Sequence, residues 1–198
     1  MEPAGSLGQP GILKNIVDIA TFLVVAGSAI VALIHLRHLR ASNQLRALLA
    51  IQRSFQKRDL QQALRYVQAE LPERLEDPSY RAEVAARGFV DPLRHPELLV
   101  CNFFDGLGAM LKCDLVEETG FMELFARLAL WYWDRLMPVV GLMRRNRTQT
   151  EYHNFEYLAI RAGAWIRRHP QGTFPKEHAR LTVVDPWQDQ DAARQSHG

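Results

Sequence analysis

The 198-residue sequence is poor in cysteine and carries almost no excess charge. Its two cysteines, Cys101 and Cys113, fall in one predicted helix, where they would stand about 18 Å apart, too far for a disulfide. The formal net charge of +2 argues against a dedicated nucleic-acid-binding protein. With 47% hydrophobic residues, the chain is neither disordered nor fibrous. These absences leave one globular domain with an appendage.

The sequence also lacks the short motifs that hold metals, nucleotides or nucleophiles. It has no CxxC, HExxH or ExxH pair, no Walker A loop and no GxSxG elbow. Asp105-Gly-Leu-Gly108 begins like a dinucleotide fingerprint, but Leu111 replaces the third glycine, so we expect these glycines to allow close helix packing. His35 and His38, one helical turn apart, leave open a haem or pigment ligand, although an interfacial role is commoner. We therefore predict no metal site and no cofactor.

One long hydrophobic run occupies residues 16–36. As a helix it would be about 32 Å long, enough to cross a hydrocarbon core of roughly 30 Å. Asp18 and His35 lie within two residues of its ends, and no charge lies between Ile19 and Ile34. The alternatives are a buried soluble helix and a cleaved signal peptide. A segment that is apolar on every face favours an uncleaved transmembrane anchor.

The charges that flank this run predict its orientation. Arg37 and Arg40 open a basic stretch that continues to Arg58 without an acidic residue, whereas residues 1–15 carry little charge. The positive-inside rule therefore puts the short tail of residues 1–15 outside and residues 37–198 in the cytoplasm. Because basic side chains at this depth are attracted to anionic lipids, we expect Arg37 and Arg40 to contact headgroups.

The remaining sequence predicts an all-α fold, in which the transmembrane helix continues into a cytoplasmic bundle of about four to five helices. Residues 37–58 lack glycine and proline and extend the anchor as a juxtamembrane helix. Apolar residues at helical spacing indicate a helical domain over residues 59–169, followed by a polar tail at 170–198. The expected helices cover residues 59–71, 79–87, 97–113, 119–146 with a kink or restart at Pro138, and 151–169.

Two acidic residues, Asp105 and Glu156, are embedded in apolar helices. Burial would suit either carboxyl to general acid catalysis, as active sites require. The alternative is structural, with an arginine fixing helix register through an ion pair. We favour the structural role and predict that Glu156 pairs with Arg127 or Arg135 of the preceding helix.

Five aromatic residues are candidates for a partner surface. They are Phe104, Trp131, Trp133, Trp165 and Trp187. We expect the first four in the core. An exposed cluster among the five would mark a protein interface.

Three segments in this order resemble a family of small bacterial membrane-anchored helical proteins that is described only as a domain of unknown function. The segments are CNFFDGLGAMLKCDLVEE, LALWYWDRLMPVV and YHNFEYLAIRA, and the resemblance covers about residues 16–169. Asp105 stands where the family usually has Glu. The resemblance implies a single span and a helical cytoplasmic domain, and it implies no activity. The matching residues are Phe103, Phe104, Leu107 and Gly108, then Tyr132, Trp133 and Pro138, then Tyr152, Phe155, Glu156 and Leu158.

These features predict a single-pass protein of the bacterial inner membrane whose cytoplasmic helical domain serves interaction, scaffolding or sensing. Its expected partners are the lipid bilayer and either another protein or a second copy of the chain, with no nucleic acid. One alternative is an accessory subunit that stabilises a larger membrane complex. The other is an enzyme that uses Asp105 or Glu156, for which the sequence offers no accompanying nucleophile or metal.

Overall fold

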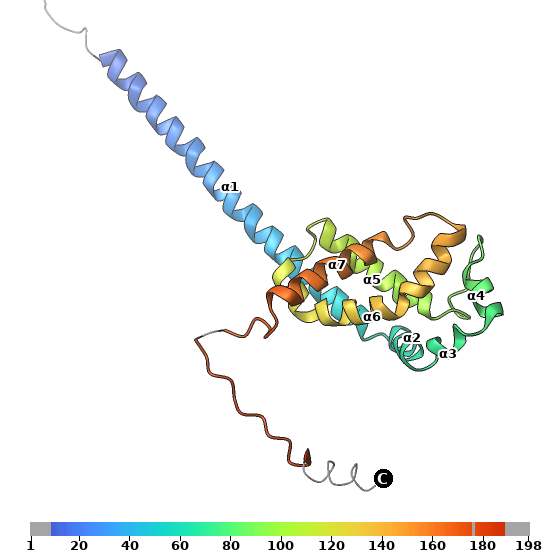
Figure 1. Cartoon of the computed structure of the whole chain (residues 1–198). Coiled ribbons are helices and arrows are strands. Elements are labelled where there is room, and N and C mark those ends of the chain that lie inside the picture. Colours follow the sequence, from blue (N-terminus) through green and yellow to red (C-terminus); the bar gives the residue numbers. More distant parts are fainter. Residues whose placement is uncertain (1–8, 176, 189–198) are drawn as a thin grey trace, which may run out of the picture.

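The computed structural model describes residues 9–175 and 177–188, and this part of the chain contains seven α-helices and no strand (Figure 1). The predicted all-α fold is therefore confirmed. Two of these helices, α3 and α4, are short, and the five longer helices contain most of the helical residues. One helix in this part is long and apolar enough to cross a membrane, with a mean hydropathy of 2.4.

Helix α1 (Gln9–Phe55) is the longest element and runs without a break from the hydrophobic segment into the bundle. Large apolar side chains between Ile19 and Leu36 are exposed on every side, since none of them meets another helix. Within this stretch the hydroxyl of Ser28 donates to the carbonyl of Val24 at 2.7 Å, which satisfies its polar group inside the helix. The prediction that the hydrophobic helix continues into the bundle is confirmed, although α1 ends at Phe55 and the predicted end at residue 58 is three residues too late.

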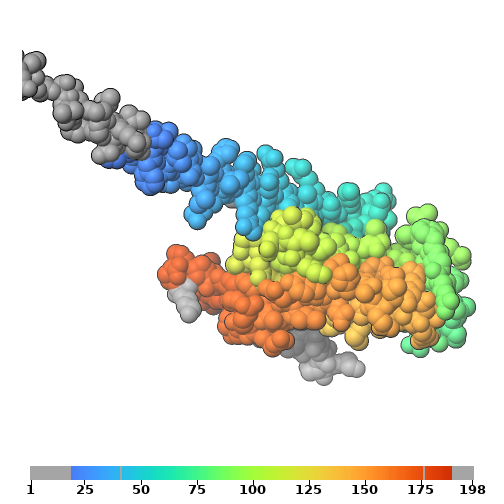
Figure 2. All heavy atoms as spheres, turned by 90° about the horizontal axis from the view of Figure 1, so that it is seen from above, coloured from blue at the N-terminus to red at the C-terminus, as the bar shows by residue number. Residues whose placement is uncertain are grey.

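The last turns of α1 lie along the bundle (Figure 2), and their inner side contributes to its core. Ile51 is buried, and the ring of Phe55 lies 5.9 Å from Phe103 and 6.2 Å from Phe125, measured between ring centroids. These contacts fix the last turns of α1, and through them its exposed apolar part, to two other helices. Leu45 and Leu49, earlier in the same helix, are about half exposed.

Helices α2 to α4 form the first part of the bundle. α2 (Arg58–Ala69) buries one apolar stripe, whereas its polar face meets solvent. The predicted end near Leu71 is slightly wrong, because Pro72 sits in the first turn of α3 (Leu71–Arg74), where a missing N–H costs nothing. α4 (Pro78–Val84) is capped by Asp77, whose carboxylate accepts a hydrogen bond from the Ser79 N–H at 2.8 Å.

Helices α5 (Glu97–Lys112), α6 (Glu118–Asn146) and α7 (His153–Arg168) make up the rest of the bundle. α7 packs along both α5 and α6, and its inward side is fully buried at Phe155, Leu158 and Ala162. α6 continues through Pro138, so the predicted restart is wrong: proline removes one backbone bond, and the surrounding buried side chains hold the helix together.

The two ends of the bundle differ in position relative to α1. α4 and the loop that follows it lie at the end farthest from the exposed part of α1, as both views show (Figures 1 and 2). Beyond α7, residues 170–175 and 177–187 form no helix and are largely exposed. The remainder of the predicted polar tail lies outside the described residues.

Candidate functional site

Asp105, one of the two acidic residues singled out from the sequence, lies where α5 crosses the start of α7. Oδ1 of Asp105 accepts from the backbone N–H groups of Asn154 and Phe155, both at 3.0 Å, and Oδ2 accepts from Nδ2 of Asn154 at 3.1 Å. The first N–H groups of a helix have no partner within it. Asp105 supplies that partner from another helix, so its carboxylate caps α7 and lies at its positive end.

A glycine makes this close crossing feasible. A Cβ atom placed on Gly108 would lie 2.0 Å from the backbone oxygen of Asn154, so only glycine fits there. The expected role in helix packing is thus confirmed for Gly108. It is wrong for Gly106, around which nothing lies within 4 Å of the same position.

The aromatic residues of the three matching segments pack beside this cap. The buried ring of Phe104 stacks on Phe155 at 5.0 Å and 14°, and it also meets Tyr132 at 5.4 Å. The Trp133 ring meets the Phe155 ring edge-on, with 5.0 Å between the ring centroids. Such rings contribute through burial and through offset or edge contacts. The three segments therefore build one structural joint between α5, α6 and α7.

The five candidate aromatic residues do not gather on one surface. Phe104 is buried as expected, whereas Trp131, Trp133 and Trp165 are partly buried and pack against the edge of the core. Trp187 is 63% exposed in the segment after α7. The expectation of four core residues is therefore correct for Phe104 and only in part for the three tryptophans.

Glu156 does form an ion pair with α6, but the predicted partners are wrong. Nη2 of Arg144 lies 2.7 Å from Oε2 of Glu156. Arg135 instead lies over the Trp131 ring at 3.2 Å, and Arg127 is exposed. The short connection from α6 to α7 brings the first turn of α7 to the last turn of α6, and Arg135 and Arg127 lie about 14 and 26 Å farther back along that helix.

The two cysteines are free, and they lie in different environments. Burial, together with the nearby charges of Glu97 and Asp105, raises the pKa of the Cys101 thiol well above its usual range. A buried thiol that stays protonated is a poor nucleophile. Cys113 is exposed at the end of α5 and makes no disulfide with Cys101, as the sequence predicted.

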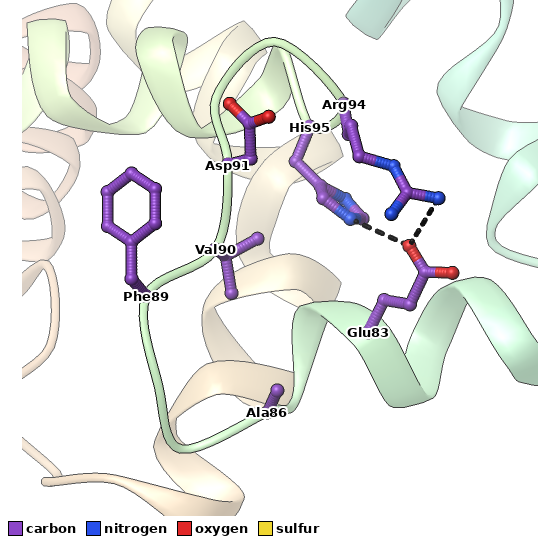
Figure 3. Close-up of a pocket in the computed structure, with 7 residues that line it drawn as sticks. All are labelled: Glu83, Ala86, Phe89, Val90, Asp91, Arg94 and His95. Carbon is purple, nitrogen blue, oxygen red and sulfur yellow. Dashed lines mark hydrogen bonds and ion pairs between the residues drawn. The ribbon is translucent and has the colours of Figure 1, made fainter.

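A second polar site, which the sequence analysis missed, lies at the end of the bundle far from the exposed part of α1. His95 and Glu97 are 3% and 0% exposed. Nδ1 of His95 lies 3.0 Å from Oε1 of Glu97, and Nε2 lies 3.3 Å from Oε2 of Glu83. Figure 3 shows His95 and Arg94 both reaching Glu83, whereas Phe89 points away from it. Each nitrogen of one buried imidazole thus faces a carboxylate.

The Glu97 carboxylate is held in a nearly closed environment. Its Oε2 atom is buried and has no hydrogen-bond partner among the described residues. The Tyr80 ring packs on His95 at 4.9 Å, and its hydroxyl lies 2.9 Å from that of Tyr66. Burial, the bond to Tyr66 and the Glu97 carboxylate all raise the pKa of Tyr80, so its phenol stays protonated at neutral pH. Glu97 begins α5, where the helix dipole favours a negative charge.

This site borders an open cleft of about 340 Å³. The cleft offers two carboxylates, an imidazole and a guanidinium but no hydroxyl or thiol, so its side chains can accept and donate a proton. Its lining residues are Glu83, Ala86, Phe89, Val90, Asp91, Arg94 and His95.

A sequence signal for this site did exist. His95, Pro96 and Glu97 stand together where a proline-containing loop meets a helix, and proline at that point fixes the histidine next to the first helical residue. The signal is weak because Glu in a first turn is common at any helix. The partner Glu83 is twelve residues earlier, so only the folded chain brings the three groups together.

The candidates at the membrane side make no ligand-like cluster. Arg37, Arg40, His35 and His38 are all exposed on α1. In the part of the chain that the structure describes, no group of three or more His, Cys, Asp or Glu side chains is arranged to hold a metal ion. Headgroup contact by the arginines and a haem or pigment at the histidines stay predictions.

Comparison with known proteins gives a family but no activity. Residues 22–162 match the family described as "Domain of unknown function (DUF4760)", which agrees with the resemblance drawn from the aromatic segments. No curated protein and no solved structure matches the chain. The match covers well over half of the chain, and the protein belongs to the DUF4760 family of domains of unknown function.

Proposed function

We propose that this protein is a single-pass protein of the bacterial inner membrane that presents a helical interaction domain to the cytoplasm. The observation that carries this proposal is α1. Its outer part exposes apolar side chains over the length of a span, and its last turns are packed in the core through Ile51 and Phe55. A helix built this way fixes the domain to the membrane without a flexible linker.

The charges on α1 support the orientation. Arg37 and Arg40 follow directly after the apolar run and are exposed, so they can reach anionic headgroups on one side of the bilayer. The positive-inside rule then assigns the domain to the cytoplasm and residues 1–15 to the outside.

The end of the bundle far from α1 supports a role in protein binding. Phe89 and Leu93 are 88% and 90% exposed on the loop between α4 and α5. Arg147 holds this loop against the bundle, because its guanidinium donates to the carbonyls of Ala86 and Gly88 at 2.9 Å. Large apolar side chains on a braced loop lose little conformational entropy when a partner covers them. An accessory subunit of a larger complex would use the same surface.

The enzyme alternative has less support. Both carboxylates considered for it already hold structural partners: Asp105 accepts three hydrogen bonds at the start of α7, and Glu156 pairs with Arg144. A catalytic carboxyl needs freedom to meet a substrate. Because Asp105 and Glu156 are held by these partners, neither carboxylate has that freedom.

A topology experiment tests the anchor. Two reporters are fused after residue 198 of the full chain, one active only in the periplasm and one fluorescent only in the cytoplasm. We expect fluorescence alone. The matched control replaces Arg37 and Arg40 with Glu, which should raise the periplasmic signal because the positive flank is lost. Periplasmic activity of the unaltered chain would overturn the orientation.

A co-purification experiment tests the interaction role. The full chain is extracted in mild detergent, and the proposal expects a partner protein in fixed stoichiometry. Replacing both Phe89 and Leu93 with Ala should remove that partner, whereas the control Leu115→Ala, at a side chain 54% exposed on a different loop, should keep it. A partner that survives the double substitution assigns the contact to another surface, and a chain that purifies alone contradicts the proposal.

A further inference from the structure

The loop between α4 and α5, residues 85–96, is held at two points by different chemistry; it is called the distal loop below. Its first residues are bound through their backbone: Nδ2 of Asn146 donates to Ala85 at 2.9 Å, and Arg147 donates to Ala86 and Gly88. These bonds use carbonyls and permanent donors. They keep their strength across the neutral pH range.

The last residues of the distal loop are held through the His95 ring. Nδ1 meets Glu97 of α5 at 3.0 Å, and Nε2 meets Glu83 of α4 at 3.3 Å. A carboxylate can only accept a hydrogen bond, so both contacts are hydrogen bonds only when the imidazole carries two protons or a carboxyl carries one. The ring therefore joins two helices only in a particular proton state.

Loss of one ring proton would affect the two carboxylate contacts of His95 unequally. Glu97 is fully buried and its other oxygen has no partner, so the Nδ1 proton is the one it must keep. Glu83 has a side chain that is 47% exposed and can turn to water instead. Without the second proton, the lone pair of Nε2 faces a carboxylate oxygen, and the contact to α4 becomes repulsive.

The other polar groups around the ring have contacts of their own. The phenol of Tyr80 interacts with Tyr66 and with Glu97, and the guanidinium of Arg74 lies over the Tyr80 ring at 4.8 Å. On the loop, Arg94 reaches Glu83 only at 3.9 Å and is mostly exposed.

The remaining nearby acid is already used as well. Oδ1 of Asp91 accepts the backbone N–H of Leu93 at 2.9 Å, which closes a local turn within the distal loop. Asn146 at the end of α6 and Arg147 directly after it donate to the loop at its other end. His95 is thus the group through which proton concentration acts on residues 89–95.

We propose that the Glu83–His95–Glu97 cluster is a pH-sensitive latch on the distal loop. With two protons on the ring, the loop is closed against α4; as pH rises through the titration of the ring, Glu83 turns away and residues 89–95 loosen. The exposed side chains of Phe89 and Leu93 ride on this segment. The inference concerns the loop alone and does not rest on the membrane anchor or on a partner.

Hydrogen exchange of the full chain in detergent micelles tests the latch. Amide protection is measured by mass spectrometry from about pH 5.5 to about pH 8.5, the range in which imidazole side chains of proteins commonly gain or lose a proton, and is corrected for the intrinsic pH dependence of exchange. We expect protection of residues 89–95 to fall about tenfold across this range, as the loss of one charged hydrogen bond implies. Protection of α7 should stay constant.

Two variants separate the latch from general pH effects. Glu83→Gln should make protection independent of pH, because a carboxamide accepts from a protonated ring and donates to a neutral one. This side chain is half exposed, so the variant should fold, which the melting curve verifies. The control His153→Gln removes an exposed histidine on α7 and should leave the tenfold fall unchanged.

The result expected is a fall in the unaltered chain and in His153→Gln, with none in Glu83→Gln. Flat protection in the unaltered chain would overturn the latch, and so would an equal fall in Glu83→Gln. A folded His95→Gln variant that retains the fall would also exclude the ring as its source.

Discussion

The joint between α5 and α7 and the site at the end of the distal loop both contain a carboxylate, but the two carboxylates differ in how completely they are hydrogen-bonded. At the joint, both carboxylate oxygens of Asp105 have hydrogen-bond partners. At the distal loop, Glu97 is more deeply buried and one of its oxygens has no partner. A buried polar group that lacks a partner costs free energy that a purely structural site avoids.

This difference separates packing from candidate function. The segments that resemble the family converge on the joint, where they set helix spacing and cap α7. The distal loop instead keeps an unsatisfied carboxylate and exposes two large apolar side chains, Phe89 and Leu93. Sites that break packing rules in this way are where function is most often found.

The largest effect is expected at Gly108. A Cβ atom there would sit 2.0 Å from the Asn154 oxygen, so Gly108→Ala must push α5 and α7 apart. We expect a loss of about 3 kcal/mol in the free energy of unfolding, the upper range for overpacking. Urea denaturation of the full chain in micelles measures it. In the same helix, Gly106→Ala has free space and should gain up to about 1 kcal/mol from helix propensity.

Equal changes in the free energy of unfolding for the two substitutions would show that α5 and α7 are less tightly packed at Gly108 than the contact implies. Hydrogen exchange of the distal loop at constant pH should not respond to Gly106→Ala, because Gly106 is exposed to solvent on α5.

The next effect is expected at Asp105. Asp105→Ala removes three hydrogen bonds and the cap of α7, so we expect a loss of about 2 kcal/mol, the upper range measured for a helix cap. Asp105→Glu keeps a carboxylate on a longer side chain and should recover part of this loss by reaching the same N–H groups. Unfolding by urea reports both. A protein that keeps its stability in Asp105→Ala but loses its cellular role would instead favour the enzyme alternative.

The sequence predicted the helical class, the continuous α1 and the close approach at Gly108, because these depend on local pattern and on residue size. It misassigned the partner of Glu156, because the partner depends on which turn of α6 faces α7, and the length of the connection decides that. It missed the His95 site altogether, since Glu83 and Glu97 reach the ring from two different helices. Patterns along the chain do not contain such distances.

A smaller effect is expected from the ion pair of Glu156 with Arg144. The two side chains are 42% and 18% exposed, so solvent screens the pair, and we expect a coupling of about 0.5 kcal/mol. A double-mutant cycle with Glu156→Gln and Arg144→Met isolates it from the bond that Arg144 also donates to the Glu151 carbonyl at 2.9 Å. The control cycle with Arg127→Met should give no coupling. Coupling to Arg127 and not to Arg144 would contradict the observed pairing.

The smallest effect concerns a second helix cap, at Glu117, and it compares an exposed cap with the one at Asp105. The N–H of Gly120 and, after it, that of Thr119 lower the pKa of Glu117, although slight burial opposes them. A lowered folded pKa means that the contribution is complete above the ordinary value near 4.5 and is lost as pH falls through the lower folded pKa. Because Glu117 is exposed, we expect Glu117→Gln to cost less than about 0.5 kcal/mol at neutral pH. Melting curves of both proteins at neutral and acid pH measure this difference, which should vanish in acid. A difference that grows as the pH falls would show that the carboxylate does not stabilise α6 by capping it.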